Sequence, residues 1–314
     1  MNKILVTGAA GFIGLNFIKK FNALDKVVVV DNFTYASNPK ELQNMDVEYQ
    51  VLDISNADMV AVCFEKYKFT HVIHFAAESH VDNSIKNCMP FINSNIIGTV
   101  NLLEQSVKHN VEMFLHISTD EVFGAITDPN KFNEQSPISP QNPYSASKAS
   151  AENFVVAYGN TYKLPYIIIN SSNNYGPWQH KEKLIPKTII NCLHDIKIPV
   201  YGNGKQIRDW LYVEDTAEII ETIFYKGKTN QRYCIGGDME ISNIELVKII
   251  IDKLSVSSDI IQYVTDRLGH DIRYSTDIEK VRLELGWSPK TSLNDGLDKT
   301  IEWYKNENLR RIIT

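Results

Sequence analysis

The chain has 314 residues, of which 43% are hydrophobic and 22% charged, an ordinary balance for a globular protein of one to three domains. Its net charge of −6 argues against a nucleic-acid partner, and no apolar run approaches the roughly 18 residues that span a membrane. The four cysteines are widely spaced and no targeting segment precedes the first strand, so we expect reduced thiols, no metal site and a cytoplasmic location.

The first elements in the chain are a strand, a glycine-rich turn and a helix. A strand over Asn2–Thr7 leads into Gly8-Ala-Ala-Gly11-Phe-Ile-Gly14, and a helical pattern covers Leu15–Phe21. Glycines permit a tight turn and let a pyrophosphate approach the free N–H groups at the helix N-terminus. The segment is therefore typical of dinucleotide binding.

A second strand, Val27–Val30, ends in Asp31, whose carboxylate is placed to accept the ribose hydroxyls of NAD. No arginine lies between Asp31 and Lys40 to receive a 2′-phosphate, which favours NAD over NADP. The alternative interpretation of Asp31 is a turn residue or a helix cap, but the preceding strand, glycine turn and helix favour the cofactor.

Strands and helices then alternate, which predicts a parallel sheet with helices on both faces, an α/β Rossmann-type doubly wound fold. The expected strands are Val47–Leu52, Val72–Phe75, Met113–Ser118 and Tyr166–Asn170, and the expected helices are Ala57–Tyr67, Met89–His109 and one starting near Tyr144. The alternation loosens after a turn at Asn173–Pro177. We expect an NAD-binding domain over residues 1–175, with returning segments from the C-terminal half, and a smaller α/β substrate lobe over residues 176–314. Helices are expected in this lobe at Ile185–Leu193, Val213–Tyr225, Ile244–Leu254, Asp277–Leu285 and Leu293–Tyr304.

A second group of polar residues follows the buried strand Met113–Ser118, at the edge of the sheet where open parallel sheets bind ligands. Thr119 is followed by two acids, Asp120 and Glu121. Adjacent strand residues point to opposite faces, so the backbone must leave strand geometry just after Thr119 if both acids are to reach one substrate.

Tyr144 and Lys148 are four residues apart, on one face of a helix. The lysine ammonium is expected to lower the tyrosine pKa by about 3 units, roughly 4 kcal/mol, so that the phenol can act as a base. An exposed helix face is the alternative for this common pattern, and the dinucleotide signature and Thr119 favour a functional role.

Several longer motifs show that the chain resembles the extended short-chain dehydrogenase/reductase superfamily, and within it the nucleotide-sugar 4,6-dehydratases, above all the dTDP-glucose 4,6-dehydratase family. The resemblance covers Lys3 to about Tyr304. Beside the glycine and Tyr144/Lys148 motifs, it is carried by Phe75-Ala-Ala-Glu-Ser-His-Val-Asp82, Ser118-Thr-Asp-Glu-Val-Phe-Gly124, Ser172-Asn-Asn-Tyr-Gly-Pro177, Glu182-Lys-Leu-Ile-Pro186 and Gln206-Ile-Arg-Asp-Trp-Leu-Tyr212.

The resemblance implies conversion of dTDP-glucose or UDP-glucose to the 4-keto-6-deoxy sugar plus water, a step in rhamnose-type deoxysugar biosynthesis, with NAD recycled internally. Tyr144 takes the C4 hydroxyl proton while C4 gives hydride to NAD, and Thr119 helps hold the new carbonyl oxygen. Glu121 removes the C5 proton, and Asp120 protonates the departing C6 hydroxyl. Two neighbouring carboxylates suit this division, because like charges raise one pKa and leave one acid beside one base.

The same resemblance implies the ligand contacts. Cofactor contacts are Gly8, Gly11, Phe12, Ile13, Gly14, Asp31, Asn32, Phe33, Thr34, Asp53, Ile54, Phe75, Ala76, Ala77, Ser79, Ser94, Tyr144, Lys148 and Asn174. Substrate contacts are Ser79, Thr119, Asn173, Glu182, Lys183, Leu184, Tyr201, Arg208, Asn243, Arg267 and His270. The two arginines offer planar forks for phosphate oxygens, with surface ion pairs as the alternative. His80 and His270 are expected to form structural hydrogen bonds.

Phe123, Leu268 and Asn83 depart from the family pattern and bear on which nucleotide is accepted. The resemblance also implies a homodimer that pairs through the helices Met89–His109 and Tyr144–Tyr162, whose apolar residues fit packing against the sheet equally well. The alternatives are a UDP-sugar 4-epimerase or UDP-glucuronate decarboxylase of the same fold, and a non-catalytic NAD-binding sensor, which would have no use for the acid pair or for Tyr144 and Lys148.

Overall fold

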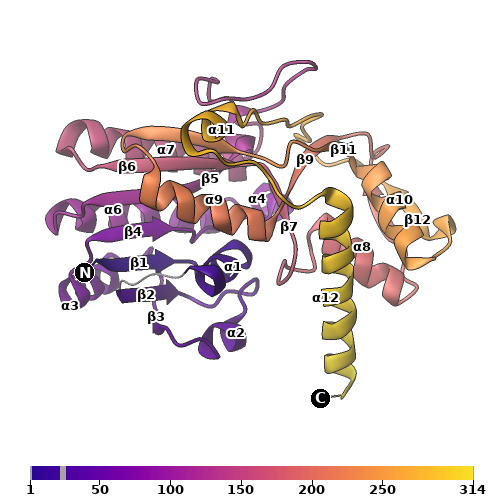
Figure 1. Cartoon of the computed structure of the whole chain (residues 1–314), viewed down its shortest axis with the longest axis horizontal. Coiled ribbons are helices and arrows are strands. Elements are labelled where there is room, and N and C mark those ends of the chain that lie inside the picture. Colours follow the sequence, from indigo (N-terminus) through magenta and orange to yellow (C-terminus); the bar gives the residue numbers. More distant parts are fainter. Residues whose placement is uncertain (1, 22–25, 314) are drawn as a thin grey trace.

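A seven-stranded parallel sheet forms the centre of the protein in the computed structural model, which describes residues 2–21 and 26–313 (Figure 1). Across the sheet the strands are β3 (Glu48–Val51), β2 (Lys26–Asp31), β1 (Lys3–Thr7), β4 (His71–His74), β5 (Met113–Thr119), β6 (Tyr166–Ser171) and β10 (Gln231–Ile235). The order reverses between β1 and β4, which is the doubly wound topology whose ligands bind beyond the carboxyl ends of the strands. The predicted Rossmann-type α/β fold is confirmed.

Side chains of each strand alternate between two helical layers. In β1, Ile4 and Val6 join the hydrophobic cluster on one face, whereas Leu5 joins the cluster on the other. The first face is covered by α1 (Phe12–Lys20), α2 (Pro39–Gln43), α9 (Val213–Lys226) and α11 (Glu279–Leu285), and the second by α3 (Ala57–Tyr67), α6 (Gly98–Lys108) and α7 (Pro143–Tyr162). Because both faces are covered, the strands read as continuous apolar runs.

The helix expected over Met89–His109 has a π-helical insertion. It consists of α5 (Met89–Phe91), the π turn η1 (Ile92–Ile97) and α6 in succession, and a short helix, α4 (Val81–Lys86), precedes it. The insertion includes the buried Asn95, whose side chain bonds both backbone groups of Glu78, N at 2.8 Å and O at 3.0 Å, and donates to Ser147 Oγ at 2.8 Å. The π turn therefore fixes the loop after β4 against α7, a local role typical of such insertions.

A smaller group of elements from the C-terminal half lies at the carboxyl edge of the main sheet (Figure 1). It contains a three-stranded sheet of β7 (Asn173–Tyr175), β9 (Ile207–Tyr212) and β11 (Glu240–Ser242), a pair of β8 (Ile198–Tyr201) and β12 (Ile261–Val264), and the helices α8 (Leu184–Leu193), α10 (Asn243–Leu254), η3 (Ser258–Ile260) and α12 (Leu293–Ile313). The turn expected at Asn173–Pro177 is partly strand instead, because β9 pairs with it from Asn173 opposite Trp210.

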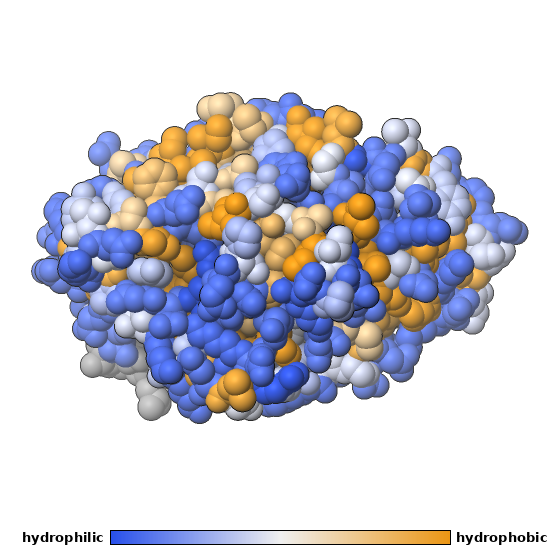
Figure 2. Space-filling model, turned by 90° about the horizontal axis from the view of Figure 1, so that it is seen from above, coloured by the Kyte–Doolittle hydropathy of each residue, from blue (hydrophilic) through white to orange (hydrophobic). Residues whose placement is uncertain are grey.

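Segments from the C-terminal half return to the main sheet, as expected. β10 extends the sheet beside β6, and α9 packs against α1. Within the described ranges, no helix is both long and apolar enough to cross a membrane. The face seen in Figure 2 is largely hydrophilic, with apolar side chains along its upper margin and further ones scattered over its middle.

Candidate active site

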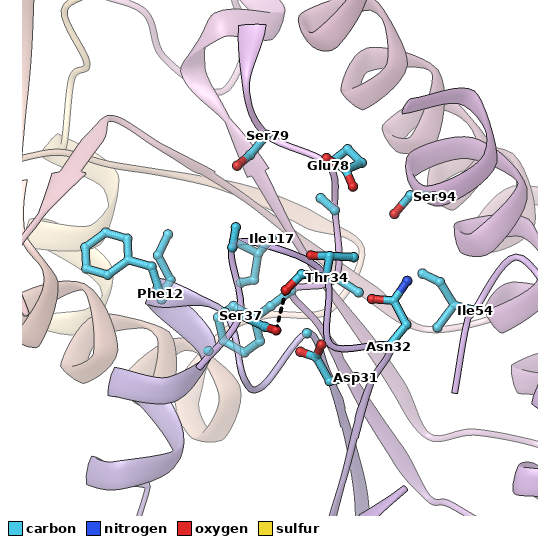
Figure 3. A pocket seen from close by; sticks show the side chains of 18 of the residues that line it. Phe12, Asp31, Asn32, Thr34, Ser37, Ile54, Glu78, Ser79, Ser94 and Ile117 are labelled. Carbon is cyan, nitrogen blue, oxygen red and sulfur yellow. Dashed lines mark hydrogen bonds between the residues drawn. The ribbon is translucent and has the colours of Figure 1, made fainter. Parts of the chain in front are cut away.

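A cavity of about 470 Å³ lies over the glycine-rich turn (Figure 3). α1 begins after Gly11 with no side-chain cap and no acidic residue in its first turn, so its first N–H groups can serve an anion. A Cβ on Gly14 would lie 2.3 Å from Gly8 O, and one on Gly8, whose φ is +70°, would lie 2.4 Å from Ala76 N. Only glycine allows this close turn.

Asp31 lies across the cavity from Glu78 and Ser79 (Figure 3). Its buried carboxylate accepts the backbone N–H of Ala10 at 2.9 Å and of Phe33 at 2.8 Å. Burial raises the pKa of Asp31, and these backbone hydrogen bonds partly offset the shift. Each oxygen retains a lone pair, so the carboxylate can accept further hydroxyl donors.

Most of the predicted cofactor contacts line this cavity: Gly8, Gly11, Phe12, Ile13, Gly14, Asp31, Asn32, Thr34, Asp53, Ile54, Phe75, Ala76, Ala77, Ser79, Ser94, Tyr144 and Lys148. Two predicted contacts do not. Phe33 packs against the hydrophobic cluster on the α1 side, and Asn174 lines a second cavity, where its amide donates to Ser171 Oγ at 2.7 Å. Ser37 and Glu78 line the cavity without having been predicted, although Glu78 stands within the motif Phe75–Asp82.

The second cavity, of about 180 Å³, lies between the main sheet and the C-terminal elements. Its lining contains the predicted substrate contacts Ser79, Asn173, Glu182, Lys183, Leu184, Tyr201, Arg208, Asn243, Arg267 and His270. Thr119 lines neither cavity. The two cavities share Ser79, Gln179, Glu182 and Lys183, so they form one continuous site.

The acid pair leaves the strand where the sequence required it to. β5 ends at Thr119, and the 3₁₀ turn η2 (Asp120–Phe123) follows at once, with Thr119 Oγ1 accepting the N–H of Glu121 at 3.2 Å. The turn separates the two carboxylates. Glu121 lines the second cavity, whereas Asp120 is only 1% exposed and accepts a hydrogen bond from Thr276 Oγ1 at 3.4 Å.

The two acids differ in their electrostatic surroundings. Burial raises the pKa of Asp120 well above its ordinary value, and the charges of Glu121 and Asp209 raise it further. Burial also raises the pKa of Glu121, but Arg208 and two other cations oppose that shift. Asp120 therefore holds its proton more firmly than Glu121, which is the asymmetry needed for one acid and one base.

Tyr144 lies beside Thr119 and Glu121. Burial and the charge of Glu121 raise the pKa of the Tyr144 phenol, while a hydrogen bond with the Thr119 side chain opposes the shift. Lys148 does not take part, because its amine donates to Ile117 O at 2.8 Å and lies 3.5 Å from His116 Nε2. The expected lowering of the Tyr144 pKa by Lys148 is wrong for this arrangement. Burial lowers the pKa of Lys148 itself to about 8.

The cations of the second cavity are already partnered. Arg267 forms a two-pronged ion pair with Asp82, at 2.6 and 3.2 Å, and Tyr201 donates to the same carboxylate at 3.0 Å. Arg208 donates to two backbone oxygens, those of Ile207 at 2.7 Å and Asp271 at 2.9 Å. Asp82 was not predicted as a site residue, although it ends a motif that carried the resemblance.

Among residues 2–21 and 26–313, no group of three or more histidine, cysteine or acidic side chains could hold a metal. His270 Nδ1 lies 2.6 Å from Asp266 Oδ1, and His80 Nε2 lies 3.7 Å from Glu182 Oε2. Both histidines thus have carboxylate neighbours within the protein.

Comparison with known proteins places this site in a family. The model of the GDP-mannose 4,6 dehydratase family matches residues 5–300. A dTDP-glucose 4,6-dehydratase of Haemophilus influenzae is 42% identical over 97% of this chain and 98% of its own length, and dTDP-glucose 4,6-dehydratase 1 of Escherichia coli K12 is 44% identical over 96% and 92%.

Among solved structures, DesIV, a dTDP-glucose 4,6-dehydratase from Streptomyces venezuelae with NAD and TYD bound, matches with a TM-score of 0.94 at 39% identity, over 98% of each chain. A UDP-glucose 4-epimerase from Thermotoga maritima, with UDP-glucose, matches at 0.92 and 28% identity over 98% of this chain and 99% of its own. The fold alone therefore does not separate dehydratase from epimerase. The family match over nearly the whole chain shows that this protein belongs to the GDP-mannose 4,6 dehydratase family.

Proposed function

We propose that the protein is an NAD-dependent dTDP-glucose 4,6-dehydratase, which forms the dTDP-4-keto-6-deoxy sugar and water. The observation that carries this proposal is the division of the acid pair, with Asp120 shielded beside Thr276 and Glu121 in the cavity next to Tyr144. The names of relatives similar over nearly their whole length support dTDP over UDP as the nucleotide.

The larger cavity fits a dinucleotide on its own features. The uncapped N-terminus of α1 suits a pyrophosphate, and Asp31 suits ribose hydroxyls at the far end. When bound there, NAD would supply hydride chemistry, accepting hydride from C4 and returning it to C6. DesIV and a UDP-glucose 4-epimerase from Thermus thermophilus were both crystallised with NAD.

In this proposal Tyr144 removes the proton of the C4 hydroxyl, and Thr119, hydrogen-bonded to it, helps hold the carbonyl oxygen that forms. The protein by itself keeps the Tyr144 phenol protonated, since burial and Glu121 raise its pKa. A positive charge bound in the larger cavity, which both Tyr144 and Lys148 line, would favour the ionised phenol.

Glu121 then removes the C5 proton, which the C4 ketone has made acidic, and Asp120 protonates the leaving C6 hydroxyl. The higher proton affinity of Asp120 supports this assignment. The order of the two proton affinities thus matches the roles of acid and base.

The second cavity supplies the substrate contacts. Arg208 and Arg267 offer planar forks, and Lys183 a point charge, for the diphosphate. Asn173 Oδ1 and Asn243 Oδ1 are buried and, within the part of the chain described, accept no hydrogen bond, so each can accept one from the ligand.

We also propose a homodimer that pairs through α5, η1, α6 and α7. Four large apolar side chains are exposed along these helices: Met89, Ile97, Phe154 and Tyr162. We also propose a cytoplasmic location, which the four free cysteines support. The division of the chain into two domains at residue 175 stays a proposal as well.

The proposal is tested by offering the purified protein dTDP-glucose or UDP-glucose without added NAD and following the nucleotide sugars by mass spectrometry. We expect loss of one water from dTDP-glucose, faster than from UDP-glucose. A product of unchanged mass with inverted C4 would instead make the protein an epimerase, and no turnover with retained NAD would support a sensor.

A further inference from the structure

Asp209 lies in β9, within the motif Gln206–Tyr212, and none of the roles above uses it. It is 1% exposed, as buried as Asp120. Its position in β9 places it opposite Glu240 of β11. A carboxylate so far from water requires an explanation, because burial without compensation is costly.

The backbone holds the Asp209 carboxylate in one place. Its Oδ1 accepts the N–H of Met239 at 3.0 Å, and its Oδ2 accepts that of Gly237 at 3.2 Å. These donors stabilise the ionised form. Burial raises the pKa of Asp209 to about 6, and the two backbone donors and the charge of Lys131 oppose the rise.

Asp209 and Asp120 approach each other around Thr276. The Thr276 hydroxyl donates to Asp120 Oδ2 at 3.4 Å. A Cβ on Gly236 would lie 2.3 Å from Asp209 Oδ2 and 3.2 Å from Thr276 Cβ. The absence of a side chain at Gly236 therefore leaves room for Asp209 and Thr276 to lie near each other. The charge of Asp209 in turn raises the pKa of Asp120.

Other charged groups around the two carboxyls do not replace this effect. Arg208 of β9 acts on Asp120 in the opposite sense, and Lys131, from the loop before α7, favours the ionised form of Asp209. Glu240 of β11 is held by Arg273 at 2.7 and 2.9 Å. The Cys234 thiol of β10 also lies near Asp120, whose charge contributes to the raised pKa of this thiol.

We propose that Asp209 is a positioning residue for the dehydration, a fixed negative charge that keeps Asp120 protonated and ready to act as the acid. Glu121 cannot do this throughout the cycle, because it becomes neutral when it takes the C5 proton. Asp209 remains ionised, so Asp120 regains a proton after each turnover. The inference rests on the proposed dehydratase function for its place in the reaction.

The test reads the protonation of Asp120 directly, apart from turnover. Infrared spectra of the full chain at a series of pH values give the carbonyl band of a protonated carboxylic acid, and the band lost in Asp120→Asn belongs to Asp120. In Asp209→Asn we expect this band to disappear at a pH lower by about one unit or more than in the wild type.

Asp215→Asn is the matched control, because Asp215 is also buried and accepts two backbone N–H groups, those of Lys290 at 3.1 Å and Thr291 at 2.8 Å. It should leave the Asp120 titration unchanged. A second variant serves if Asp209→Asn does not fold. Lys131→Met removes a positive charge that favours the ionised form of Asp209, so we expect it to shift the Asp120 band in the same direction by a smaller amount. An Asp120 band that titrates as in the wild type in the folded variants would overturn the proposal.

Kinetics then separate this inference from the proposed function. Wild-type turnover of dTDP-glucose tests the dehydratase proposal by itself. With a C6-fluoro analogue, whose leaving group departs without a proton, Asp209→Asn should eliminate at close to the wild-type rate while it loses at least about tenfold on dTDP-glucose at pH 8. Equal losses on both substrates would mean that Asp209 only supports the fold.

Discussion

The two cavities of this protein are built in different ways. The larger one is built around a glycine turn, the uncapped start of α1 and strand ends, with the Asp31 carboxylate held by two backbone N–H groups. The second is lined by long charged side chains that already have partners within the protein, such as Arg267 with Asp82 and Arg208 with two backbone oxygens. A backbone site is preformed for a ligand that stays, whereas a site of paired charges must exchange partners each time substrate enters.

In the proposed function, this contrast also explains why the chemistry lies where the two cavities meet. Tyr144 and Lys148 line the larger cavity, and Glu121 lines the second. With the proposed roles of these residues, the reacting sugar lies where the two cavities meet, beside Ser79, Gln179, Glu182 and Lys183, which line both.

The largest effect is expected from Glu121→Gln, at the junction. The amide cannot remove the C5 proton, so we expect elimination to slow by about 10³-fold, within the range for loss of a general base, or roughly 4 kcal/mol. Hydride transfer to the cofactor should persist and be visible as reduced-nicotinamide absorbance. Elimination at the wild-type rate would show that another group is the base.

The preformed cavity can be tested with two glycines that share a positive φ. Gly8→Ala adds strain of about 1–2 kcal/mol and also pushes a methyl group to 2.4 Å from Ala76 N. Gly286→Ala adds the same strain but meets nothing within 4 Å. We expect the protein to lose its bound NAD only in Gly8→Ala, measured as NAD released from denatured protein. Equal NAD content in the two variants would contradict a cavity built by this turn.

The buried Asp120 is expected to lower the stability of the protein while it supports activity. The pKa of Asp120 in the folded protein lies above its value of about 4 in the unfolded chain. Between these two pKa values the folded protein binds more protons than the unfolded chain, so its stability falls as the pH rises. Asp120→Asn removes this penalty. The variant should be inactive yet more stable than the wild type in urea unfolding, by an amount that grows as the pH rises from 5 to 8. A difference that does not change with pH would mean that Asp120 ionises normally.

The smallest effect on activity is expected from changing the ion pair of Asp82 with Arg267 in the second cavity. Burial alone would raise the pKa of Asp82, but Arg267 and the Tyr201 hydroxyl hold it below its ordinary value. Asp82→Asn frees the Arg267 fork for phosphate, so we expect KM for dTDP-glucose to fall by about threefold to tenfold, roughly 1 kcal/mol, with kcat little changed. Asp266→Asn, beside His270, is the control. A rise in KM would show that Asp82 orients Arg267 instead of competing for it.

The residue pattern by itself located the larger cavity, whereas the residues of the second cavity were implied by the family resemblance. A backbone site leaves glycines and strand ends in the sequence, and the glycine turn and Asp31 found in this way line the cavity, as do nearly all the cofactor contacts implied by the resemblance. The break in the backbone after Thr119 also followed from strand geometry alone, and η2 lies at that point.

What the sequence did not predict depends on contacts distant in the chain. The spacing of Tyr144 and Lys148 fixes their helix face but not the reach of the amine, which ends at β5. The π turn before α6 and the pairing of β7 with β9 have no local signal. Asp209 and Asp120, whose charges we propose to be coupled, are 89 positions apart in the chain, and no spacing rule could join them.

The most direct measurement follows a deuterium atom placed at C4 of dTDP-glucose. If the two cavities meet around one sugar as described, the product loses one water and carries the deuterium at C6, since hydride leaves and returns within one site. Deuterium returned to C4 without loss of water, or its exchange into solvent, would contradict the account.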